Sequence, residues 1–261
     1  MADRLEGIVS IITGSTSGLG AATAARFASE GARVVVSGRN EERGEAVAES
    51  IRKADGEACF IRCDLDDETS IEQLVASTLE HFGRLDNVVA NAAATATTTG
   101  EKTAGILELD NAILEASIAT NIRGLLWLFK HTLPPLLDAA QPDQERTSSI
   151  VAIGTSGTRN GAPGMPAYWA TKAPVEVMVR SLATEFGGRG LRVNAVSSGL
   201  ILTESELRTM TDEFRQYVMS LNALPYLGRP DDIADACLYL SSEEAHYVTG
   251  TTICVNGGAA Y

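Results

Sequence analysis

Apolar runs of strand length alternate with segments of helical period along the whole chain. The short runs are nearly continuous in Val, Ile and Ala, which is typical of strands buried on both faces of a parallel sheet. The segments between them repeat apolar residues on one helix face, as at Leu19, Ala22 and Phe27. Strands are predicted at Gly7–Thr13, Ala32–Ser37, Glu57–Arg62, Leu85–Ala90, Ser148–Ile153, Leu191–Val196 and Thr251–Val255. Helices are predicted at Gly18–Glu30, Glu41–Ala54, Asp67–Phe82, Asp110–Asn121 and Ile122–Leu137, with further helical segments between the later strands.

This alternation predicts an α/β fold. Because crossovers between parallel strands are right-handed, the elements are expected to form a doubly wound sheet of about seven strands with helices on both faces. No linker-like shift in composition divides the chain, so residues 1–261 are expected to form a single domain. Loops that follow the carboxyl ends of such strands bind ligands, which singles out Ala93–Gly105 and Ser198–Leu227. We expect residues 198–227 to form the substrate loop.

The composition narrows the class of partner. Hydrophobic residues make up 44% of the chain and charged residues 21%, as in ordinary globular proteins. The formal net charge of −13 disfavours nucleic acid and anionic membranes as partners. No secretion signal is seen at the start, and no apolar stretch of about 18 residues predicts a membrane span.

Cysteine and histidine residues are too scattered to predict a disulfide framework or a metal site. Cys59 and Cys63 lie in a strand-like run and are expected in the core. None of the three histidines lies near a cysteine pair in the sequence. We therefore expect a reduced, cytoplasmic protein without a bound metal.

A glycine-rich segment joins the first predicted strand to the first predicted helix. Glycines permit a tight turn and let backbone N–H groups approach a pyrophosphate, and the helix N-terminus favours negative charge. Glycines also occur in ordinary turns, but this strand–turn–helix setting is the one that dinucleotide binding requires. The predicted cofactor-binding residues are Gly14, Ser15, Thr16, Ser17, Gly18, Leu19 and Gly20.

The end of the second predicted strand bears on the choice between NAD and NADP. An acidic residue at position 38 would accept hydrogen bonds from the adenine ribose and select NAD, but this chain has a glycine there. Arg39 suits the 2′-phosphate of NADP(H), although it also fits a surface position at the head of the next helix. NADP(H) is therefore favoured and NAD(H) stays an alternative. Asp64 and Leu65 are predicted near the adenine, and Asn91 near a ribose.

Tyr168 and Lys172 are the candidate proton-transfer pair. Their spacing of four residues places both side chains on one helix face. A free tyrosine has a pKa of about 10, and a neighbouring ammonium favours the phenolate. Tyr168 is then suited to exchange a proton with an alcohol or a carbonyl. Alone, this spacing also occurs by chance in many helices.

In combination, these motifs resemble the short-chain dehydrogenase/reductase family over essentially the whole chain. The resemblance implies a Rossmann fold, a nicotinamide cofactor and Tyr168 as the general acid and base. It further implies that Lys172 holds the nicotinamide ribose and that Asn121 anchors a water linked to the lysine. The segments that carry it are Thr13–Gly20, Asp64, Ala90–Ala93, Asn121, Tyr168 with Lys172, Arg192–Val196 and Gly250 with Val255–Gly258.

The sequence departs from the family pattern around the expected nicotinamide. The usual serine that orients the substrate oxygen is Thr155 here, with Ser156 next to it as the alternative. Ser198 and Gly199 stand where the family has Pro-Gly, so the backbone there is expected to be less fixed. Pro174 should bend the helix that carries Lys172. The other positions that the resemblance places at the cofactor are Ala92, Ala93, Gly199, Ile201 and Thr203.

These observations favour hydride transfer between NADP(H) and a ketone or secondary alcohol. The alternatives are an NAD-dependent dehydrogenase of the same type and a non-catalytic NADP-binding regulatory protein. Reduction of a carbon–carbon double bond is disfavoured, because family members that do this usually have a longer tyrosine–lysine spacing. A homotetramer or homodimer is expected from the resemblance. A mainly apolar substrate pocket is predicted from Ala94, Thr95, Arg159, Met165, Trp169, Leu200 and the substrate loop.

Overall fold

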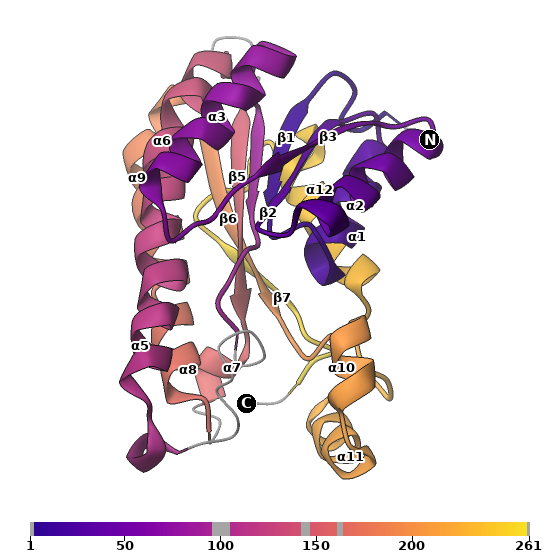
Figure 1. The fold of residues 1–261 in the computed structure, drawn as a ribbon, viewed down its shortest axis with the longest axis vertical. Coiled ribbons are helices and arrows are strands. Elements are labelled where there is room, and N and C mark those ends of the chain that lie inside the picture. Colours follow the sequence, from indigo (N-terminus) through magenta and orange to yellow (C-terminus); the bar gives the residue numbers. More distant parts are fainter. Residues whose placement is uncertain (1–2, 96–104, 142–146, 161–163, 260–261) are drawn as a thin grey trace.

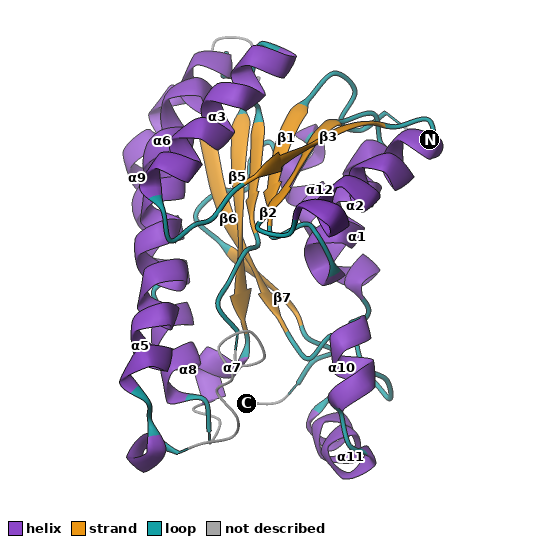
Figure 2. Cartoon of the chain, viewed as in Figure 1, coloured by secondary structure: helices purple, strands orange, loops and turns teal. Residues whose placement is uncertain are grey.

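The computed structural model describes residues 3–95, 105–141, 147–160 and 164–259. Its strands form one parallel sheet in the order β3-β2-β1-β4-β5-β6-β7 (Figures 1 and 2). The predicted doubly wound, single-domain Rossmann-type fold is thereby confirmed. The strands are β1 (Val9–Thr13), β2 (Arg33–Gly38), β3 (Glu57–Arg62), β4 (Asn87–Ala90), β5 (Ser148–Thr155), β6 (Leu191–Ser198) and β7 (Thr252–Val255).

The helices begin where polar residues cap them. Asn40 and Asp67 accept hydrogen bonds from the first turns of the second and third helices, and Gly83 ends the third in a left-handed conformation. The first elements are α1 (Gly18–Ala28), α2 (Glu41–Lys53), α3 (Glu68–Phe82), η1 (Ile106–Glu108), α5 (Asn111–Ile118), η2 (Ala119–Gly124) and α6 (Leu125–Ala139). The later ones are α7 (Gly157–Asn160), α8 (Pro166–Lys172), α9 (Val175–Phe186), η4 (Gly187–Arg189), α10 (Glu204–Thr209), α11 (Asp212–Leu221), α12 (Pro230–Ser241) and η5 (Glu243–Ala245).

Helices cover both faces of the sheet, with α3, α6 and α9 on one side and α1, α2 and α12 on the other (Figure 1). In β1, neighbouring side chains pack into the hydrophobic layers on opposite faces of the sheet. Ile11 belongs to the core cluster that contains Leu74 and Leu128, whereas Ile12 belongs to the cluster with Phe27 and Ile233. Successive side chains of a strand point to opposite faces, so a nearly continuous apolar run fills both layers.

The position of a ligand site follows from the strand order. Strand β1 pairs with β2 on one side and with β4 on the other, so the chain reverses its direction of winding between β1 and β4. Doubly wound sheets bind ligands at the carboxyl ends of the strands beside this switch point. In Figure 1 this is the lower edge of the sheet, where α7, α8, α10 and α11 lie.

Two predicted helices form one continuous helix in the structure. The segments α5, η2 and α6 run without interruption over Asn111–Ala139, joined by the π-helical turn η2. By length and composition alone this helix could cross a membrane, contrary to the expectation that no such segment exists. A core helix of a soluble protein passes the same test. Here Leu128, Phe129 and Leu136 are buried in the core cluster against the sheet.

The helix is broken at Pro174, directly after the candidate catalytic pair, where the sequence predicted a bend. Helix α8 ends at Lys172 and α9 begins at Val175, with Pro174 as the residue that precedes it. Proline has no N–H to donate into the preceding turn. The break fixes the end of α8 directly after the lysine.

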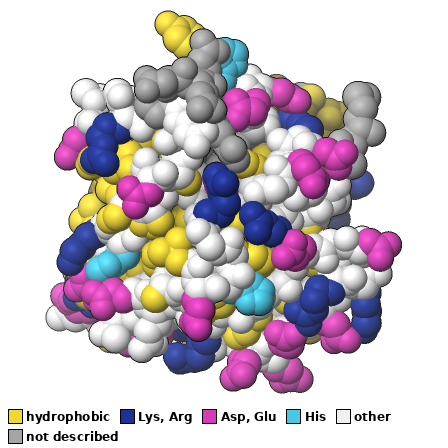
Figure 3. All heavy atoms as spheres, turned by 90° about the horizontal axis from the view of Figure 1, so that it is seen from above, with side chains coloured by type: hydrophobic (Ala, Val, Ile, Leu, Met, Phe, Trp, Pro, Cys, Tyr) yellow, Lys and Arg dark blue, Asp and Glu magenta, His cyan; other side chains and the backbone are white. Residues whose placement is uncertain are grey.

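The face at the amino ends of the strands, opposite the switch point, is a mixed surface. Acidic and basic side chains are interspersed there, with hydrophobic ones between them (Figure 3). Mixed charges of this kind are typical of a solvated surface. Of the predicted loop Ala93–Gly105, residues 96–104 lie outside the described residues, and Ala93, Ala94 and Thr95 line the cavity described below.

Candidate active site

The glycine-rich loop is locked to the end of β4. The Thr13 hydroxyl accepts hydrogen bonds from the backbone N–H groups of Asn91 and Ala92, both at 3.1 Å. The Asn91 amide donates to the carbonyl oxygens of Thr13 (3.0 Å) and Gly14 (3.1 Å). Asn91, predicted beside a ribose, thus holds the loop itself. Gly14 has a φ of +65°, and a Cβ there would lie 2.8 Å from Cα of Ala92.

Two predicted cofactor residues lie behind the surface of the cavity. Ser15 is fully buried, and its hydroxyl donates to the Ile12 carbonyl at 2.6 Å and accepts from the Ser37 N–H at 2.8 Å. At Gly20 an added Cβ would lie 2.6 Å from the Asn91 amide nitrogen. Both residues shape the loop, and neither lines the cavity. The cavity is lined by Gly14, Thr16, Ser17, Gly18 and Leu19 of this segment.

The end of the cavity beside the carboxyl ends of β2 and β3 carries two guanidinium groups. Arg39, which precedes α2, and Arg43, in the first turn of α2, both line it together with Asp64 and Leu65. Among the described residues neither arginine side chain forms an ion pair. Sequence reasoning missed Arg43, although its place in the first turn of the helix that follows Arg39 could have indicated it. At Gly38 an added Cβ would lie 2.7 Å from the Thr16 methyl, so the position has little room for a carboxylate.

Tyr168 and Lys172 lie together in one cavity with the glycine loop. The cavity has a volume of about 2280 Å³ and extends from Arg39 to α11. The Lys172 ammonium is buried and donates a 2.6 Å hydrogen bond to the Ile153 carbonyl. Both predicted catalytic side chains therefore line the space that leads to the loop.

The pKa values of this pair move in opposite directions. Burial raises the pKa of Tyr168 to about 12, and the negative charge of Glu206 acts in the same direction. Burial lowers the pKa of Lys172 to about 8. Both shifts follow from desolvation, which disfavours whichever form is charged. The lowering of the tyrosine pKa that the sequence suggested is not found in this structure, because burial and the charge of Glu206 both act to raise it.

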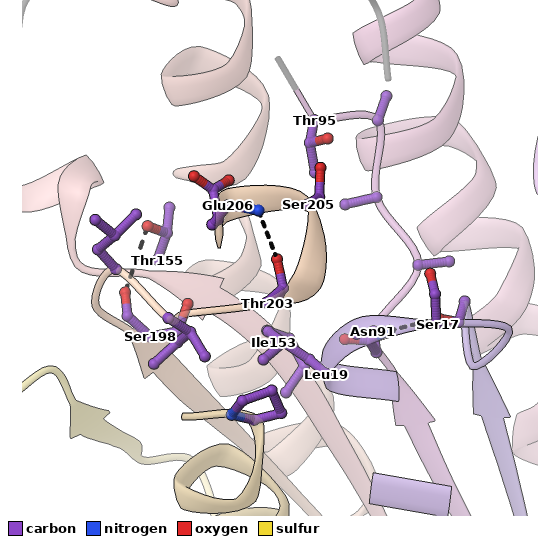
Figure 4. A pocket seen from close by; sticks show the side chains of 18 of the residues that line it. Ser17, Leu19, Asn91, Thr95, Ile153, Thr155, Ser198, Thr203, Ser205 and Glu206 are labelled. Atoms are coloured by element: carbon purple, nitrogen blue, oxygen red, sulfur yellow. Dashed lines mark hydrogen bonds between the residues drawn. The ribbon is translucent and has the colours of Figure 1, made fainter. Parts of the chain in front are cut away.

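Thr155 faces the cavity, whereas Ser156 does not. Thr155 lines the cavity beside Tyr168, and its hydroxyl donates to the Ser198 carbonyl at 3.5 Å (Figure 4). Ser156 is 1% exposed and donates to the Ser197 carbonyl at 3.4 Å. Of the two hydroxyls considered for the serine role, only that of Thr155 is at the cavity.

The backbone at Ser198 and Gly199 is held in place. The Ser198 hydroxyl donates to the Gly154 carbonyl at 3.2 Å, and the Gly199 N–H donates to the Val255 carbonyl at 2.9 Å. These bonds tie the segment to β5 and β7, and the expectation of a backbone less fixed than with proline stays a prediction. Gly199, Ile201 and Thr203 line the cavity as predicted.

Asn121 lies in the π-helical turn η2, behind the cavity. It is 3% exposed, and its amide is used in full by the protein. The oxygen accepts from the Ala94 N–H at 2.8 Å, and the nitrogen donates to the Ala94 carbonyl at 2.9 Å and the Thr171 hydroxyl at 3.0 Å. Asn121 thus joins the end of β4 to α8, the helix of Tyr168 and Lys172. Its predicted contact with a water is not tested here.

The substrate side of the cavity is mainly apolar. Of the residues predicted there, Ala94, Thr95, Met165, Trp169 and Leu200 line it. Arg159 does not, because its guanidinium pairs with Glu176 at 2.9 Å and points away. The predicted substrate loop folds into α10 and α11, which add Leu207, Met210, Phe214, Tyr217, Val218 and Leu221.

Comparison with known proteins identifies the family. A family model described as enoyl-(acyl carrier protein) reductase matches residues 14–260. The chain belongs to the short-chain dehydrogenase/reductase family. It is 36% identical to a 2,5-dichloro-2,5-cyclohexadiene-1,4-diol dehydrogenase of Sphingobium indicum, over 99% of this chain and 98% of that protein. It is 30% identical to a 7alpha-hydroxysteroid dehydrogenase of Bacteroides fragilis, over 98% of this chain and 95% of that protein.

The solved structures of short-chain dehydrogenase/reductases agree with this assignment. A 7alpha-hydroxysteroid dehydrogenase complexed with NADH and 7-oxo glycochenodeoxycholic acid is 30% identical to the chain and has a TM-score of 0.90. The match covers 98% of this chain and 96% of that one. Members of the family bind NAD(P)H, and the relatives named above are dehydrogenases. The chain is therefore an oxidoreductase of alcohol- and ketone-type substrates.

Proposed function

We propose that the chain transfers hydride between NADP(H) and a cyclic secondary alcohol or its ketone, with Tyr168 as the general acid and base. The observation that carries this proposal is a single cavity lined by the glycine loop, Lys172, Tyr168 and Thr155. The loop offers a phosphate site, and the hydroxyls of Tyr168 and Thr155 can form hydrogen bonds with the reacting oxygen of the substrate.

The residues present fit a nicotinamide dinucleotide. The positive φ of Gly14 (+65°) and Gly18 (+56°) keeps the loop free of side chains where it opens onto the cavity. The N-terminus of α1 lies behind it and favours a pyrophosphate. Lys172 reaches the cavity from α8 and would hold the nicotinamide ribose. When bound, the dinucleotide supplies or accepts the hydride.

Tyr168 is in the right state to donate a proton during reduction. With a pKa of about 12, its phenol is protonated at neutral pH. Thr155 supplies a second hydroxyl to the same cavity, which would orient the carbonyl oxygen. In the direction of alcohol oxidation the phenolate must form, and the Lys172 ammonium below it would stabilise that charge.

NADP(H) is the favoured cofactor because Arg39 and Arg43 both line the adenosine end of the cavity. Two guanidinium groups without ion-pair partners among the described residues suit a 2′-phosphate. The crowding between Gly38 and Thr16 leaves little room for the carboxylate that would select NAD. The neighbour solved with NADH keeps NAD(H) as the alternative.

A cyclic alcohol is the proposed substrate class because the lining is mainly apolar and the similar proteins named above act on a cyclic diol and on hydroxysteroids. Reduction of a carbon–carbon double bond is the second candidate reaction, because the matched family model is described as an enoyl-(acyl carrier protein) reductase. The four-residue spacing of Tyr168 and Lys172 argues against it. We further propose a cytoplasmic homotetramer or homodimer formed by a single domain of residues 1–261.

The test measures turnover of a panel of cyclic alcohols and ketones. The absorbance of NADPH or NADH reports the rate, and the two cofactors are compared in parallel. Wild-type protein should turn over members of the panel faster with NADPH, and an enone should react at its carbonyl. Tyr168→Phe should lower kcat by roughly 10²- to 10⁴-fold, because a positioned acid contributes that much. Tyr239→Phe on α12, outside the cavity, is the matched control and should keep its activity.

The outcomes separate the readings. Near-full turnover by a folded Tyr168→Phe protein would exclude the proposed mechanism. Tight NADPH binding without turnover across the panel would favour the regulatory reading instead. Loss of the carbon–carbon double bond of the enone would favour the second enzyme reading.

A further inference from the structure

Glu206 places a carboxylate in the substrate part of the cavity. It lies on α10 and lines the cavity that also contains Tyr168 and Thr155. Figure 4 shows its carboxylate extending from α10 toward the side of the cavity where Thr155 lies. The start of α10 is also close to the glycine loop, since a Cβ at Gly18 would lie 3.5 Å from the Thr203 methyl.

The usual local role of such a glutamate is not filled here. A Thr-x-x-Glu sequence at a helix start can form a capping box, in which the glutamate side chain accepts a hydrogen bond from the N-cap N–H. Thr203 does accept a hydrogen bond from the Glu206 N–H at 3.3 Å. The N–H of Thr203, however, donates to the Ile201 carbonyl at 2.9 Å. The Glu206 carboxylate is therefore left to face the cavity.

Glu206 and Tyr168 both line the cavity, and the charge of the glutamate acts on the tyrosine. Burial raises the pKa of Glu206, so part of the carboxylate has left water. Its negative charge adds to the effect of burial in raising the pKa of Tyr168.

No described residue donates a hydrogen bond to this carboxylate or forms an ion pair with it. Arg208, on the same helix, is within 3.5 Å of Glu204 instead. Lys172 is held by the Ile153 carbonyl. A half-buried carboxylate without a donor is unfavourable, and a ligand that supplies the donor removes this penalty. Trp169 also lines the cavity, and its buried indole N–H has no partner among the described residues, so it does not donate to Glu206 in this structure. Leu207, which lines the cavity too, has no side-chain donor.

We propose that Glu206 is a substrate-binding residue that accepts a hydrogen bond from a second hydroxyl group, so that the preferred substrates are cyclic diols. The inference rests on the proposed function, because the first hydroxyl is the one that reacts at Tyr168. It also means that alcohols with a carboxylate in the same place are disfavoured, because they would bring two negative charges together.

The experiment compares matched probes with the cofactor-loaded protein. The probes are cyclohexanol, the 1,2-, 1,3- and 1,4-cyclohexanediols, and 4-hydroxycyclohexanecarboxylate. For the best diol, wild-type kcat/KM should exceed that for cyclohexanol by roughly tenfold or more, as expected for a hydrogen bond to a charged group. Glu206→Gln should reduce this ratio, and Glu206→Leu should abolish it. Because the Glu206 charge also raises the pKa of Tyr168, the absolute rates with cyclohexanol are expected to change, so every comparison is a ratio to cyclohexanol within one variant. In both variants the ratio for the hydroxy acid should exceed that of wild type.

Glu213→Gln is the matched control. It removes the same charge from α11, where the side chain is exposed and outside the cavity, and it should leave every ratio unchanged. Opposite responses of the diol and the hydroxy acid cannot arise from general damage to α10. An unchanged diol ratio in Glu206→Leu would overturn the inference.

Failure of the proposed function gives a different result. In that case the wild type oxidises none of the probes, and the cofactor-loaded protein is instead tested for thermal stabilisation by each of them. Greater stabilisation by a diol than by cyclohexanol, lost in Glu206→Leu, would still support the hydroxyl site. Equal stabilisation in both proteins would overturn it.

Discussion

Substitution of Gly14 by alanine tests whether close backbone approach shapes the cofactor loop. Two effects act at this position. The φ of +65° is in the left-handed region, which costs an L-residue about 1–2 kcal/mol. The new Cβ would also lie 2.8 Å from Cα and 3.1 Å from N of Ala92. Because these are backbone atoms at the end of β4, relief requires the loop or that strand end to move.

Gly83→Ala separates the two effects. Gly83 has a φ of +76°, and nothing lies within 4 Å of its added Cβ. It therefore reports the conformational penalty alone, about 1–2 kcal/mol. Gly14→Ala should lose that amount and about 1–3 kcal/mol more, the usual penalty of overpacking. It should also weaken NADP(H) binding by roughly tenfold or more, because a displaced loop loses at least one hydrogen bond to a charged phosphate.

The assay is urea unfolding of both variants, together with cofactor titration followed by nucleotide fluorescence. A Gly83→Ala protein with wild-type cofactor affinity and a small loss of stability sets the reference. If Gly14→Ala unfolds at the same urea concentration as Gly83→Ala and binds NADP(H) equally well, the contact with Ala92 does not constrain the loop. The reasoning from the close approach would then be wrong.

Two further predictions concern the catalytic side chains. Thr155→Val removes the hydroxyl at nearly constant volume and should lower kcat by roughly 10²- to 10³-fold, the usual effect of losing a donor to a developing oxyanion. The kcat of Ser156→Ala should stay within a few-fold of wild type. A larger loss of turnover in the Ser156 variant than in the Thr155 variant would reverse their roles. Lys172→Met should raise the free energy of unfolding at pH 7 by about 1–3 kcal/mol, since the pKa of Lys172 falls from 10.5 to about 8 on burial. In the window from pH 8 to 10.5 the unfolded chain binds more protons, so wild-type stability rises with pH and the advantage of the variant should shrink. Denaturant unfolding across this range, with an advantage that stays constant, would contradict the assignment.

Patterns that are local in the sequence predicted most of the fold. Each strand was placed to within a few residues, because buried parallel strands are nearly continuous apolar runs. The helix Asn111–Ala139 was divided in two because the π-helical turn η2 inserts an extra residue and shifts the phase of the apolar face. A period of 3.6 residues on either side of such a turn is indistinguishable from two separate helices.

The parts of the site that were missed depend on contacts between distant segments. Arg159 was placed in the substrate pocket, but Glu176 on α9 holds its side chain elsewhere. Asn91 was predicted beside a ribose because it follows a strand; it does line the cavity, but the hydrogen bonds from its amide to Thr13 and Gly14 of the loop were not foreseen. Neither partner is near in the sequence, so no local pattern could show these bonds.

Glu206 shows the same limit most sharply, because its sequence setting suggests an ordinary local role. The motif from Thr203 to Glu206 fits a capping box, and a reader of the sequence would assign the carboxylate to the backbone. Only half of that box forms, since the Thr203 N–H is already bonded to Ile201. This bond depends on how the chain turns after β6, which the apolar pattern does not encode. A single backbone hydrogen bond thus decides whether Glu206 caps a helix or faces the substrate.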